Sequence, residues 1–371
     1  MKIALFLANA GKNSGGPEVY EVELLRALAR LDRKNEYHVF FLFERGPETV
    51  RLTQDNVFYH VLKPKTRAVS LSITLPLALR RLRPDAIHST FIPPAMIPRR
   101  MAYTLPCTAV FARPHYYPAL IRLRLQALCG LGIRKSQAVV CISQHVQDWM
   151  REEIGLSVDR LPLIPLAAST GFRPMTDDER RPIVEDKYGL KHPYFLFSGR
   201  WEPRKNLSRL VVAFAQFKKE VKTDFKLALT GERTWAAKEV LGLIRQLDIK
   251  EDVVDLGKSP LSDLPALYGG ATALVYPSLW ESFGLPIVEA MRCGVPVVTS
   301  RVAAMPETVG NAGLLVDPLS VEEIADAMRR LSQDSSLRQY LRNEGIKRSK
   351  EFSWDQTARK SLAVYEYLAA Q

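Results

Sequence analysis

The sequence predicts an α/β protein with two domains, each built around a parallel β-sheet. The chain has 371 residues, more than one hydrophobic core usually organises. Short apolar runs alternate with segments of helical periodicity, which is the pattern of βαβ units. A polar, proline-bearing stretch at residues 161–182 interrupts this alternation once and is the expected linker.

The first domain is expected to span residues 1–168. Its opening run KIALFLA leads directly into a glycine turn, which favours a buried strand over a signal peptide. A helix with Pro17 at its first position should follow. The strands of this domain are predicted at 2–8, 37–43, 85–90, 106–112 and 138–143, and its helices at 17–31, before 84 and at 144–154.

The second domain is expected to span residues 169–354 and repeats the alternation of strands and helices. Its strands are predicted at 193–199, 226–231, 252–257, 273–278, 296–300 and 313–317. Helices are predicted at 206–220, at 236–247 and after Pro286, and a helix-rich segment closes the chain. Both domains are therefore expected to be Rossmann-like.

Basic residues are concentrated in the first domain. Residues 1–168 carry 23 Lys and Arg against 13 Asp and Glu, whereas the remainder carries 29 against 27. Between residues 56 and 147, Asp85 is the only acid, against 13 bases. This pattern indicates a phospholipid surface, a phosphorylated lipid or nucleic acid as partner, and an ordinary solvated surface is the alternative.

Other sequence features exclude several classes of site. The four cysteines are scattered without a CxxC pair, which favours a reducing compartment and no disulfide framework. The sequence has no DxD, GxSxG or HExxH motif, and its six histidines are dispersed. We therefore predict no metal site and no cofactor. No apolar run approaches the ~18 residues that a membrane-spanning helix needs.

The most informative stretch is ESFGLPIVEAMRCGVPVV, residues 281–298. A strand should end just before it, and Pro286 should set the start of a helix. Helix starts expose unpaired amides and partial positive charge, so the backbone near Gly284 and Leu285 suits a phosphate.

Two glutamates in this stretch, Glu281 and Glu289, are eight residues apart, so they would not share one helix face. Glu289 is placed to accept hydrogen bonds from two vicinal hydroxyls, such as those of ribose. Glu281 would then face another part of the same ligand. The alternative is a helix-start charge at Glu289 and a solvated loop residue at Glu281.

A basic loop follows the first strand of the second domain, in the sequence FSGRWEPRKNL. Arg200 and Lys205 lie at the carboxyl end of that strand, where α/β sheets bind ligands. Two cations at this position suit a diphosphate, and ordinary surface charges are the alternative. Arg204 is expected to point to solvent.

A glycine pair, Gly15 and Gly16, precedes the first helix in NAGKNSGGPEVY. Paired glycines let backbone approach a ligand closely, although an ordinary turn would look the same. The spacing matches neither a dinucleotide fingerprint nor a P-loop.

Taken together, these motifs resemble glycosyltransferase family 4, the retaining GT-B enzymes also called glycosyl transferases group 1. The resemblance covers nearly the whole chain and includes "LYGGATALVYPSLWESFGLPIVEAMRCGVPVVTS" and "PETVGNAGLLVDP". It implies two Rossmann-like domains with parallel sheets that face each other across a cleft. It also implies that a last helix, at about 355–371, packs back on the first domain.

The resemblance assigns roles to the singled-out residues. Arg200 and Lys205 would neutralise the diphosphate leaving group, and Glu281 would contact the transferred sugar. The backbone of Phe283, Gly284 and Leu285 would contact the sugar and the diphosphate of the donor. Glu289 would bind the ribose. Gly15 and Gly16 would belong to the glycine loop that closes over the donor.

One departure from the family concerns a His-Asp pair that follows the fourth strand of the first domain in many members. The equivalent segment here reads VFARPHYYP. Ala112 and Arg113 occupy the position of the pair, and His115 follows three residues later. Either His115 takes the catalytic role from a shifted loop, or that role is absent.

The sequence therefore predicts a retaining, metal-independent hexosyltransferase that uses a nucleotide-sugar, with GDP-mannose as the preferred donor. The expected acceptor is a glycan or lipid-linked glycan in surface polysaccharide synthesis, such as that of lipopolysaccharide. The expected location is cytoplasmic or peripheral on the inner leaflet, with an anionic membrane surface and not nucleic acid as partner. The alternatives are a GT-B nucleotide-sugar epimerase and a non-catalytic binder of anionic polymers.

Overall fold

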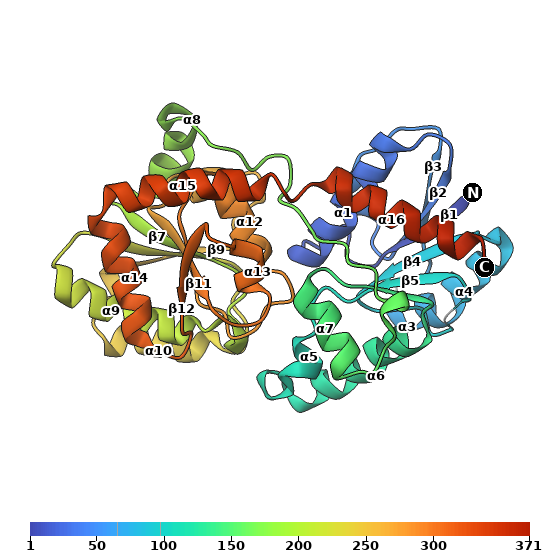
Figure 1. The fold of residues 1–371 in the computed structure, drawn as a ribbon, viewed down its shortest axis with the longest axis horizontal. Helices are drawn as coiled ribbons and strands as arrows, with labels where there is room; N and C mark the ends of the chain where they lie inside the picture. The colour runs from blue at the N-terminus through green and yellow to red at the C-terminus, as the bar shows by residue number, and fades with distance from the viewer. Residues whose placement is uncertain (65, 97) are drawn as a thin grey trace. The chain divides into compact units, whose positions relative to one another are not determined.

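The computed structural model describes residues 1–64, 66–96 and 98–371 (Figure 1). The chain divides into two compact units, the first made of Met1–Leu166 and Ser353–Gln371 and the second of Ala167–Phe352. The division lies two residues before the expected end of the first domain, and the return to the first unit begins at Ser353.

In the first unit, the described residues form a parallel sheet of six strands in the order β3-β2-β1-β4-β5-β6. The strands are β1 (Lys2–Leu7), β2 (Glu36–Phe41), β3 (Val57–Val61), β4 (Ala86–Thr90), β5 (Met101–Thr104) and β6 (Ala138–Val140). The helices are α1 (Gly16–Leu31), α2 (Gly46–Val50), α3 (Arg67–Val69), α4 (Leu75–Leu82), α5 (Ala109–Ala112), α6 (Ala119–Lys135), α7 (Gln144–Glu152) and α16 (Trp354–Ala369).

In the second unit, the sheet formed by the described residues also has six parallel strands, in the order β12-β11-β10-β7-β8-β9. The strands are β7 (Tyr194–Ser198), β8 (Lys226–Thr230), β9 (Val253–Gly257), β10 (Ala273–Tyr276), β11 (Val297–Ser300) and β12 (Gly313–Val316). The helices are α8 (Asp177–Arg181), α9 (Leu207–Val221), α10 (Ala237–Gln246), α11 (Leu264–Gly269), α12 (Leu285–Arg292), α13 (Met305–Val309), α14 (Val321–Gln333) and α15 (Ser335–Ser349).

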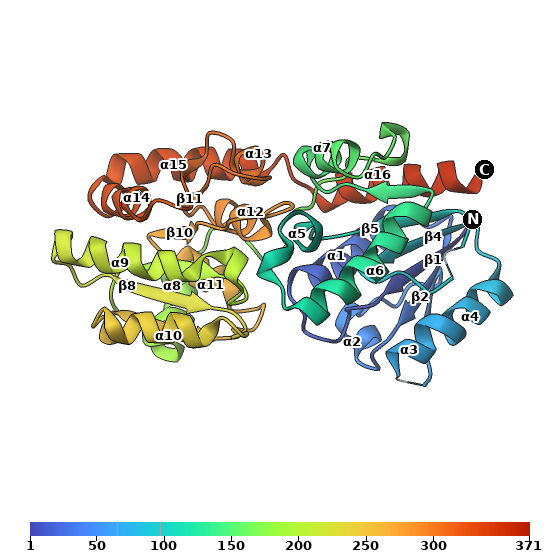
Figure 2. The same cartoon turned by 90° about the horizontal axis from the view of Figure 1, so that it is seen from below.

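The two sheets share one topology. Counted within its own unit, each sheet has the strand order 3-2-1-4-5-6, with helices on both faces (Figures 1 and 2). This is the order of doubly wound Rossmann folds. The order reverses between the first and fourth strands, which are β1 and β4 in one unit and β7 and β10 in the other. Ligands of such folds bind outside the carboxyl ends of the strands at this reversal.

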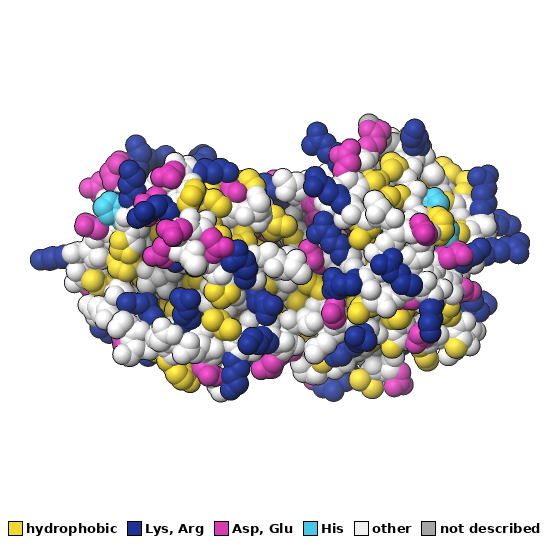
Figure 3. All heavy atoms as spheres, turned by 90° about the horizontal axis from the view of Figure 1, so that it is seen from above, with side chains coloured by type: hydrophobic (Ala, Val, Ile, Leu, Met, Phe, Trp, Pro, Cys, Tyr) yellow, Lys and Arg dark blue, Asp and Glu magenta, His cyan; other side chains and the backbone are white. Residues whose placement is uncertain are grey.

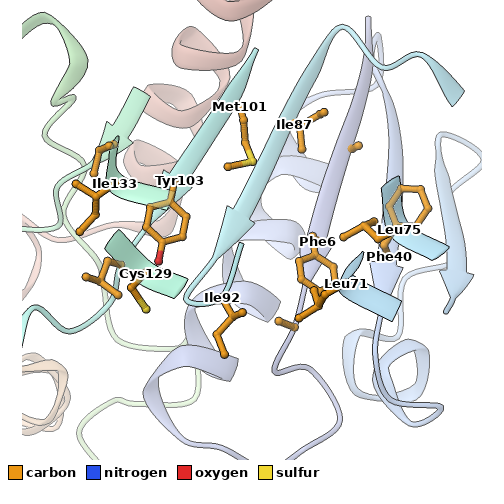
Figure 4. Close-up of a cluster of buried hydrophobic side chains, with 14 of the residues drawn as sticks. Phe6, Phe40, Leu71, Leu75, Ile87, Ile92, Met101, Tyr103, Cys129 and Ile133 are labelled. Carbon is orange, nitrogen blue, oxygen red and sulfur yellow. The ribbon is translucent and has the colours of Figure 1, made fainter. Parts of the chain in front are cut away.

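The central strands are apolar because helices cover both of their faces. In β1 every residue after Lys2 is buried, and in β7 all residues are buried. A cluster of buried side chains fills one face of the first sheet (Figure 4). Leu71 and Leu75 line it at one side, and Cys129 and Ile133 of α6 line it at the other. The segment that leads into α4 and helix α6 therefore cover the same face.

Helix α16 belongs to the first unit although it follows the second unit in sequence, and it lies beside α1 in Figure 1. Ser353 caps its start by accepting from the Asp355 amide. The Thr357 hydroxyl donates to the Pro165 carbonyl at 2.7 Å, and Tyr365 contacts the buried His88 of β4 at 2.6 Å. Within the described residues, no helix has the length and apolar content that a membrane crossing requires.

One predicted strand is wrong. Residues 106–112 do not form a strand, because the strand of this region is β5, which ends at Thr104, and Ala109–Ala112 forms the short helix α5. Pro106 has no amide hydrogen to donate to a neighbouring strand, which disfavours continuing the ladder there. The sequence prediction also omitted β3, one of the two edge strands of the sheet that the described residues form.

Candidate active site

The predicted cations and carboxylates of the second unit meet where its strand order reverses. The loop after β7 carries Lys205, and the loop after the neighbouring strand β10 carries Glu281. Lys205 Nζ donates to Glu281 Oε1 at 2.6 Å, and both side chains are more than nine-tenths buried. The two motifs therefore form one site.

The Tyr276 side chain completes this contact from the end of β10. Its hydroxyl donates to Glu281 Oε1 at 2.9 Å and accepts a hydrogen bond from Lys205 Nζ. The lysine nitrogen also lies 4.7 Å from the centre of the Tyr276 ring. Lys205 is thus fixed by one carboxylate and one phenol.

Arg204 does not point to solvent, contrary to the sequence prediction. Only 13% of its side chain is exposed. Its guanidinium donates to Glu281 Oε1 at 3.0 Å, to Glu202 Oε2 at 3.0 Å and to the Trp280 carbonyl at 3.3 Å. The carboxylates turn the arginine inward because a buried charge needs paired partners.

Arg200 is the exposed cation of this group, with 48% of its side chain accessible. It pairs with Glu202 Oε1 at 2.8 Å and donates to Glu232 Oε2 at 3.1 Å. Glu202 therefore bridges Arg200 and Arg204 with its two oxygens. Neither Glu202 nor Tyr276 was predicted, although Glu202 lies between Arg200 and Arg204 in the loop after β7 and Tyr276 ends β10.

The local charges keep Glu281 ionised. Burial alone would raise its pKa, but the charges of Lys205 and Arg204 lower it to about 2. Burial, followed by the charge of Arg204, lowers the pKa of Lys205, and Glu281 acts in the opposite direction. The site is thus a compact cluster of opposed charges.

Glu289 has a different environment within α12. It is 5% exposed and accepts a hydrogen bond from the Tyr268 hydroxyl at 2.9 Å. Burial raises its pKa to about 7, an effect that Tyr268 and Lys205 only partly offset. The two glutamates therefore differ in chemistry, since one stays ionised while the other changes charge near neutral pH.

The start of α12 has the open backbone geometry that the sequence predicts. Gly284 precedes the helix with a φ of 92°, and no side chain caps the helix. A Cβ at Gly284 would lie 2.8 Å from Ile287 Cδ1. Phe283 is buried, and its carbonyl accepts from the Thr308 hydroxyl. Leu285 is the first helical residue, so its amide is one of those that the helix leaves without an internal partner.

Asn206 holds the two loops together. Its side-chain amide donates to the Pro277 carbonyl at 2.9 Å and to the Pro318 carbonyl at 2.6 Å. The Leu279 amide also donates to the Arg204 carbonyl at 2.7 Å. Because its amide bonds to the loop after β10, Asn206 fixes the basic loop relative to Glu281.

The remaining predicted site residues belong to the first unit. Gly15 and Gly16 are exposed at the start of α1, and a Cβ on either would meet nothing within 4 Å. Gly15 has a φ of 73°, and its carbonyl accepts from two amides of the first helical turn. His115 is exposed, and its ring centre lies 4.2 Å from that of Tyr116. No group of three His, Cys, Asp or Glu side chains in the described ranges could hold a metal ion.

Comparison with known proteins identifies the family. Residues 181–348 match the family described as Glycosyl transferases group 1, and residues 14–171 match Glycosyltransferase Family 4. The O-antigen chain mannosyltransferase B of Escherichia coli is 33% identical over 261 residues, which cover 70% of this chain and 68% of that protein. The chain belongs to the group 1 glycosyltransferases. It is therefore a glycosyltransferase with two sheet-containing units of the GT-B fold.

Other relatives of this glycosyltransferase cover less of its length. The MMP alpha-(1->4)-mannosyltransferase of Mycolicibacterium hassiacum is 33% identical over 59% of this chain and 51% of that protein. The serotype-specific mannosyltransferase WbdA of Escherichia coli is 29% identical over 63% of this chain, and that match spans 29% of WbdA.

Solved structures share the fold at low sequence identity. Sucrose-phosphate synthase from Thermosynechococcus elongatus has a TM-score of 0.80 and 22% identity, covering 100% of this chain and 99% of that one. HepE from Anabaena, solved in complex with UDP-glucose, has a TM-score of 0.78 and 19% identity over the full length of both chains.

Proposed function

We propose that this glycosyltransferase moves mannose from GDP-mannose to a glycan or lipid-linked glycan in the synthesis of a surface polysaccharide, with retention of configuration and without a metal. The observation that carries the proposal is the convergence of Lys205 and Arg204 on Glu281 beside the open start of α12. That arrangement offers cations and unpaired amides to a diphosphate at the position where Rossmann-like sheets bind ligands.

The charge that these residues supply supports the proposed metal independence. Breaking the bond between sugar and diphosphate places negative charge on the leaving group. Lys205 and Arg200 would stabilise that charge together with the start of α12, and preorganised donors of this kind need little reorganisation. Arg200 pairs with Glu202 and Glu232, which fix the position of its guanidinium. The diphosphate would bind this guanidinium in that position.

The carboxylates would bind the neutral parts of the donor. Glu289 would accept hydrogen bonds from the ribose hydroxyls, while the Tyr268 hydroxyl donates to its Oε2 atom. Glu281 would contact the transferred sugar while it positions Lys205. The backbone of Phe283, Gly284 and Leu285 would contact sugar and diphosphate, and the role of Gly15 and Gly16 in donor binding stays a prediction.

If the reaction retains configuration, the state of Glu281 supports same-face attack over a covalent intermediate on this carboxylate. Its Oε1 accepts hydrogen bonds from Lys205, Arg204 and Tyr276, and its pKa of about 2 makes it a weak base. Such a carboxylate is a poor nucleophile towards the sugar. Attack by the acceptor hydroxyl on the face that the diphosphate leaves, with a phosphate oxygen taking the proton, agrees with this state.

The donor assignment is tested by ligand screening. The mannosyltransferases among the relatives support GDP-mannose, whereas HepE was solved with UDP-glucose. GDP is expected to raise the melting temperature more than UDP, dTDP or ADP. Turnover of GDP-mannose should require an acceptor, and NMR of the product should show the donor's anomeric configuration. Conversion of the donor without an acceptor would instead identify an epimerase. Preferential binding of UDP would show that the donor is a UDP-sugar and not GDP-mannose.

The location at the inner leaflet is supported by exposed apolar side chains next to bases in the first unit. Leu120 and Leu123 of α6 are 80% and 68% exposed, with Arg122 and Arg124 between and beside them. Apolar and basic residues do not occupy opposite sides of α6. Basic side chains are also spread widely over the face in Figure 3, which is viewed from the side opposite to that of Figure 2. Vesicles with anionic lipid should bind the protein at low salt, and Leu120→Asp with Leu123→Asp should weaken that binding. Equal binding of the variant would exclude α6 as the contact.

A further inference from the structure

An arginine in the first unit has buried donors without partners. Arg67 begins α3, shortly after the end of β3. Its Nε and Nη2 atoms are buried and have no hydrogen-bond partner among the described residues. A buried ionised group without partners is costly, so such a group calls for an explanation.

The surroundings place Arg67 at the reversal of strand order in the first sheet. It lies close enough to Arg124, Glu21 and Cys129 to interact electrostatically with each. Glu21 accepts from the Asn9 amide at 2.8 Å and so holds the loop after β1. Cys129 donates to the Phe91 carbonyl at 3.3 Å and so holds the loop after β4. This is the edge at which an α/β sheet binds ligands.

Among the described residues, no nearby acidic group accepts a hydrogen bond from Arg67 Nε or Nη2. Burial raises the pKa of Glu21, and its carboxylate oxygens accept hydrogen bonds from the Asn9 and Ala10 amides, not from Arg67 Nε or Nη2. Asp85 is the only acid between residues 56 and 147. Its carboxylate accepts from the Lys2 amide, at the amino-terminal edge of the sheet and away from Arg67. Arg67 and Arg124 thus form a local excess of positive charge.

The shape of the free donors defines the ligand. Nε and Nη2 lie on one edge of the planar guanidinium, and two parallel N–H groups match two oxygens of a phosphate. We propose that Arg67, assisted by Arg124, binds a phosphate or diphosphate group of the glycosyl acceptor. This inference rests on the proposed function only for naming the acceptor as the carrier of the phosphate.

Binding can be tested without turnover. Pyrophosphate is titrated calorimetrically into the wild-type protein and into the variants Arg67→Gln, Arg124→Gln and Arg80→Gln. Arg80 is an exposed arginine of α4 and provides the same charge change in the same unit. The cations of the second unit are intact in all four proteins. Weaker pyrophosphate binding than that of Arg80→Gln therefore reports a site in the first unit. Arg67→Gln should weaken that binding at least tenfold, and Arg124→Gln should weaken it by a smaller factor.

Stability separates a binding role from a structural one. Removing an unpartnered buried charge should leave the melting temperature of Arg67→Gln equal to or above that of the wild type. A variant that melts well below the wild type would overturn the assignment. So would a variant that binds pyrophosphate as Arg80→Gln does. Neither measurement needs a donor. The proposed phosphate site can therefore be disproved while the proposed transferase function is retained, and the transferase function can be disproved while the phosphate site is retained.

Acceptor kinetics then identify the source of the phosphate. Arg67→Gln should raise the KM for a diphosphate-linked saccharide at least tenfold and change the KM for the same saccharide without phosphate less than twofold. Equal effects on both acceptors would overturn the proposal. Loss of binding to anionic phospholipid vesicles, with the KM for the diphosphate-linked saccharide unchanged, would assign Arg67 to the membrane surface and also overturn it.

Discussion

The two sheets share one strand order but differ in charge pairing at the point where that order reverses. In the second unit, Lys205 and Arg204 pair with Glu281, and Arg200 pairs with Glu202. In the first unit, Nε and Nη2 of Arg67 have no partner among the described residues, and the nearby Glu21 accepts hydrogen bonds from Asn9 and Ala10 instead. The fold thus provides two equivalent positions, and the side chains after the strands decide what each position binds.

This difference suggests two ways of presenting positive charge. The paired cluster holds its cations in fixed positions, which suits stabilisation of charge that develops during a reaction. An unpaired arginine suits recognition of charge that its ligand already carries.

The largest expected effect comes from breaking the paired cluster at Lys205. Lys205→Ala should lower kcat by about 10² to 10³, equivalent to about 3–4 kcal/mol, because the leaving diphosphate loses a preorganised cation. Arg204 still pairs with Glu281 in this variant, so the fold should be retained. Initial rates and the melting temperature provide the measurement. The control is Lys238→Ala, at an exposed position of α10. Near-normal turnover of Lys205→Ala would show that Lys205 does not belong to the active site.

A second prediction uses the charge state of Glu289. Ribose binding favours the ionised carboxylate, and the pKa of Glu289 is raised to about 7. The donor KM should therefore fall about tenfold between pH 6 and pH 8 in the wild type, as the ionised fraction rises. The KM of Glu289→Gln should not depend on pH in this range. An identical pH profile in both proteins would contradict the role of Glu289.

The same group should also affect stability. The folded pKa of about 7 exceeds the ordinary value of 4.5, so the folded protein retains this proton at higher pH than the unfolded chain does. The free energy of unfolding should therefore fall by about 3 kcal/mol as pH rises from about 4.5 to 7. Urea unfolding of Glu289→Gln should lack this contribution. An unchanged slope would show that Glu289 titrates normally.

A third prediction compares two glycines of the candidate site. Gly284→Ala should destabilise the protein by about 2 kcal/mol, because φ is 92° and the new Cβ would meet Ile287. Gly16→Ala has open space and no positive φ, so its unfolding free energy should change by less than ~0.5 kcal/mol. Urea unfolding measures both. Equal decreases in the unfolding free energy of the two variants would show that backbone geometry does not distinguish the two loops.

The smallest effect is expected at His115. Its ring is exposed and packs on Tyr116. Because an exposed ring is not preorganised for proton transfer, His115→Ala should lower kcat less than about threefold. Initial rates at saturating donor measure this. A loss of 10² or more, which general acid–base catalysis supplies, would show instead that His115 takes the role of the family's missing His-Asp pair.

Local patterns in the sequence predicted much of the fold. Apolar runs bounded by Gly, Pro and polar residues marked most strands, because a strand buried on both faces reads as a continuous apolar run. The segment at 106–112 failed because its apolar composition does not show that the chain there turns into α5. The edge strand β3 was missed although its sequence VFYHV is mostly apolar, and its residues are only partly buried or exposed in the fold.

The candidate site was predicted in part for the same reason. Lys205 and Glu289 could be named because a strand end and a helix start are visible in the local sequence. Glu202, Tyr268 and Tyr276 could not, because each is recognised only by the partner that the fold brings to it. Arg204 was wrongly expected in solvent because its carboxylate partner Glu281 is distant in sequence.

The sequence by itself determined the alternation of strands and helices, the two parallel sheets, and the placement of basic and acidic residues at strand ends. These features depend on neighbours along the chain. Only the tertiary structure decided the strand order, the inward orientation of Arg204, the opposite pKa shifts of Glu281 and Glu289, and the unpaired donors of Arg67. Burial and charge pairing set these properties, and both depend on groups that the fold brings together from distant parts of the chain.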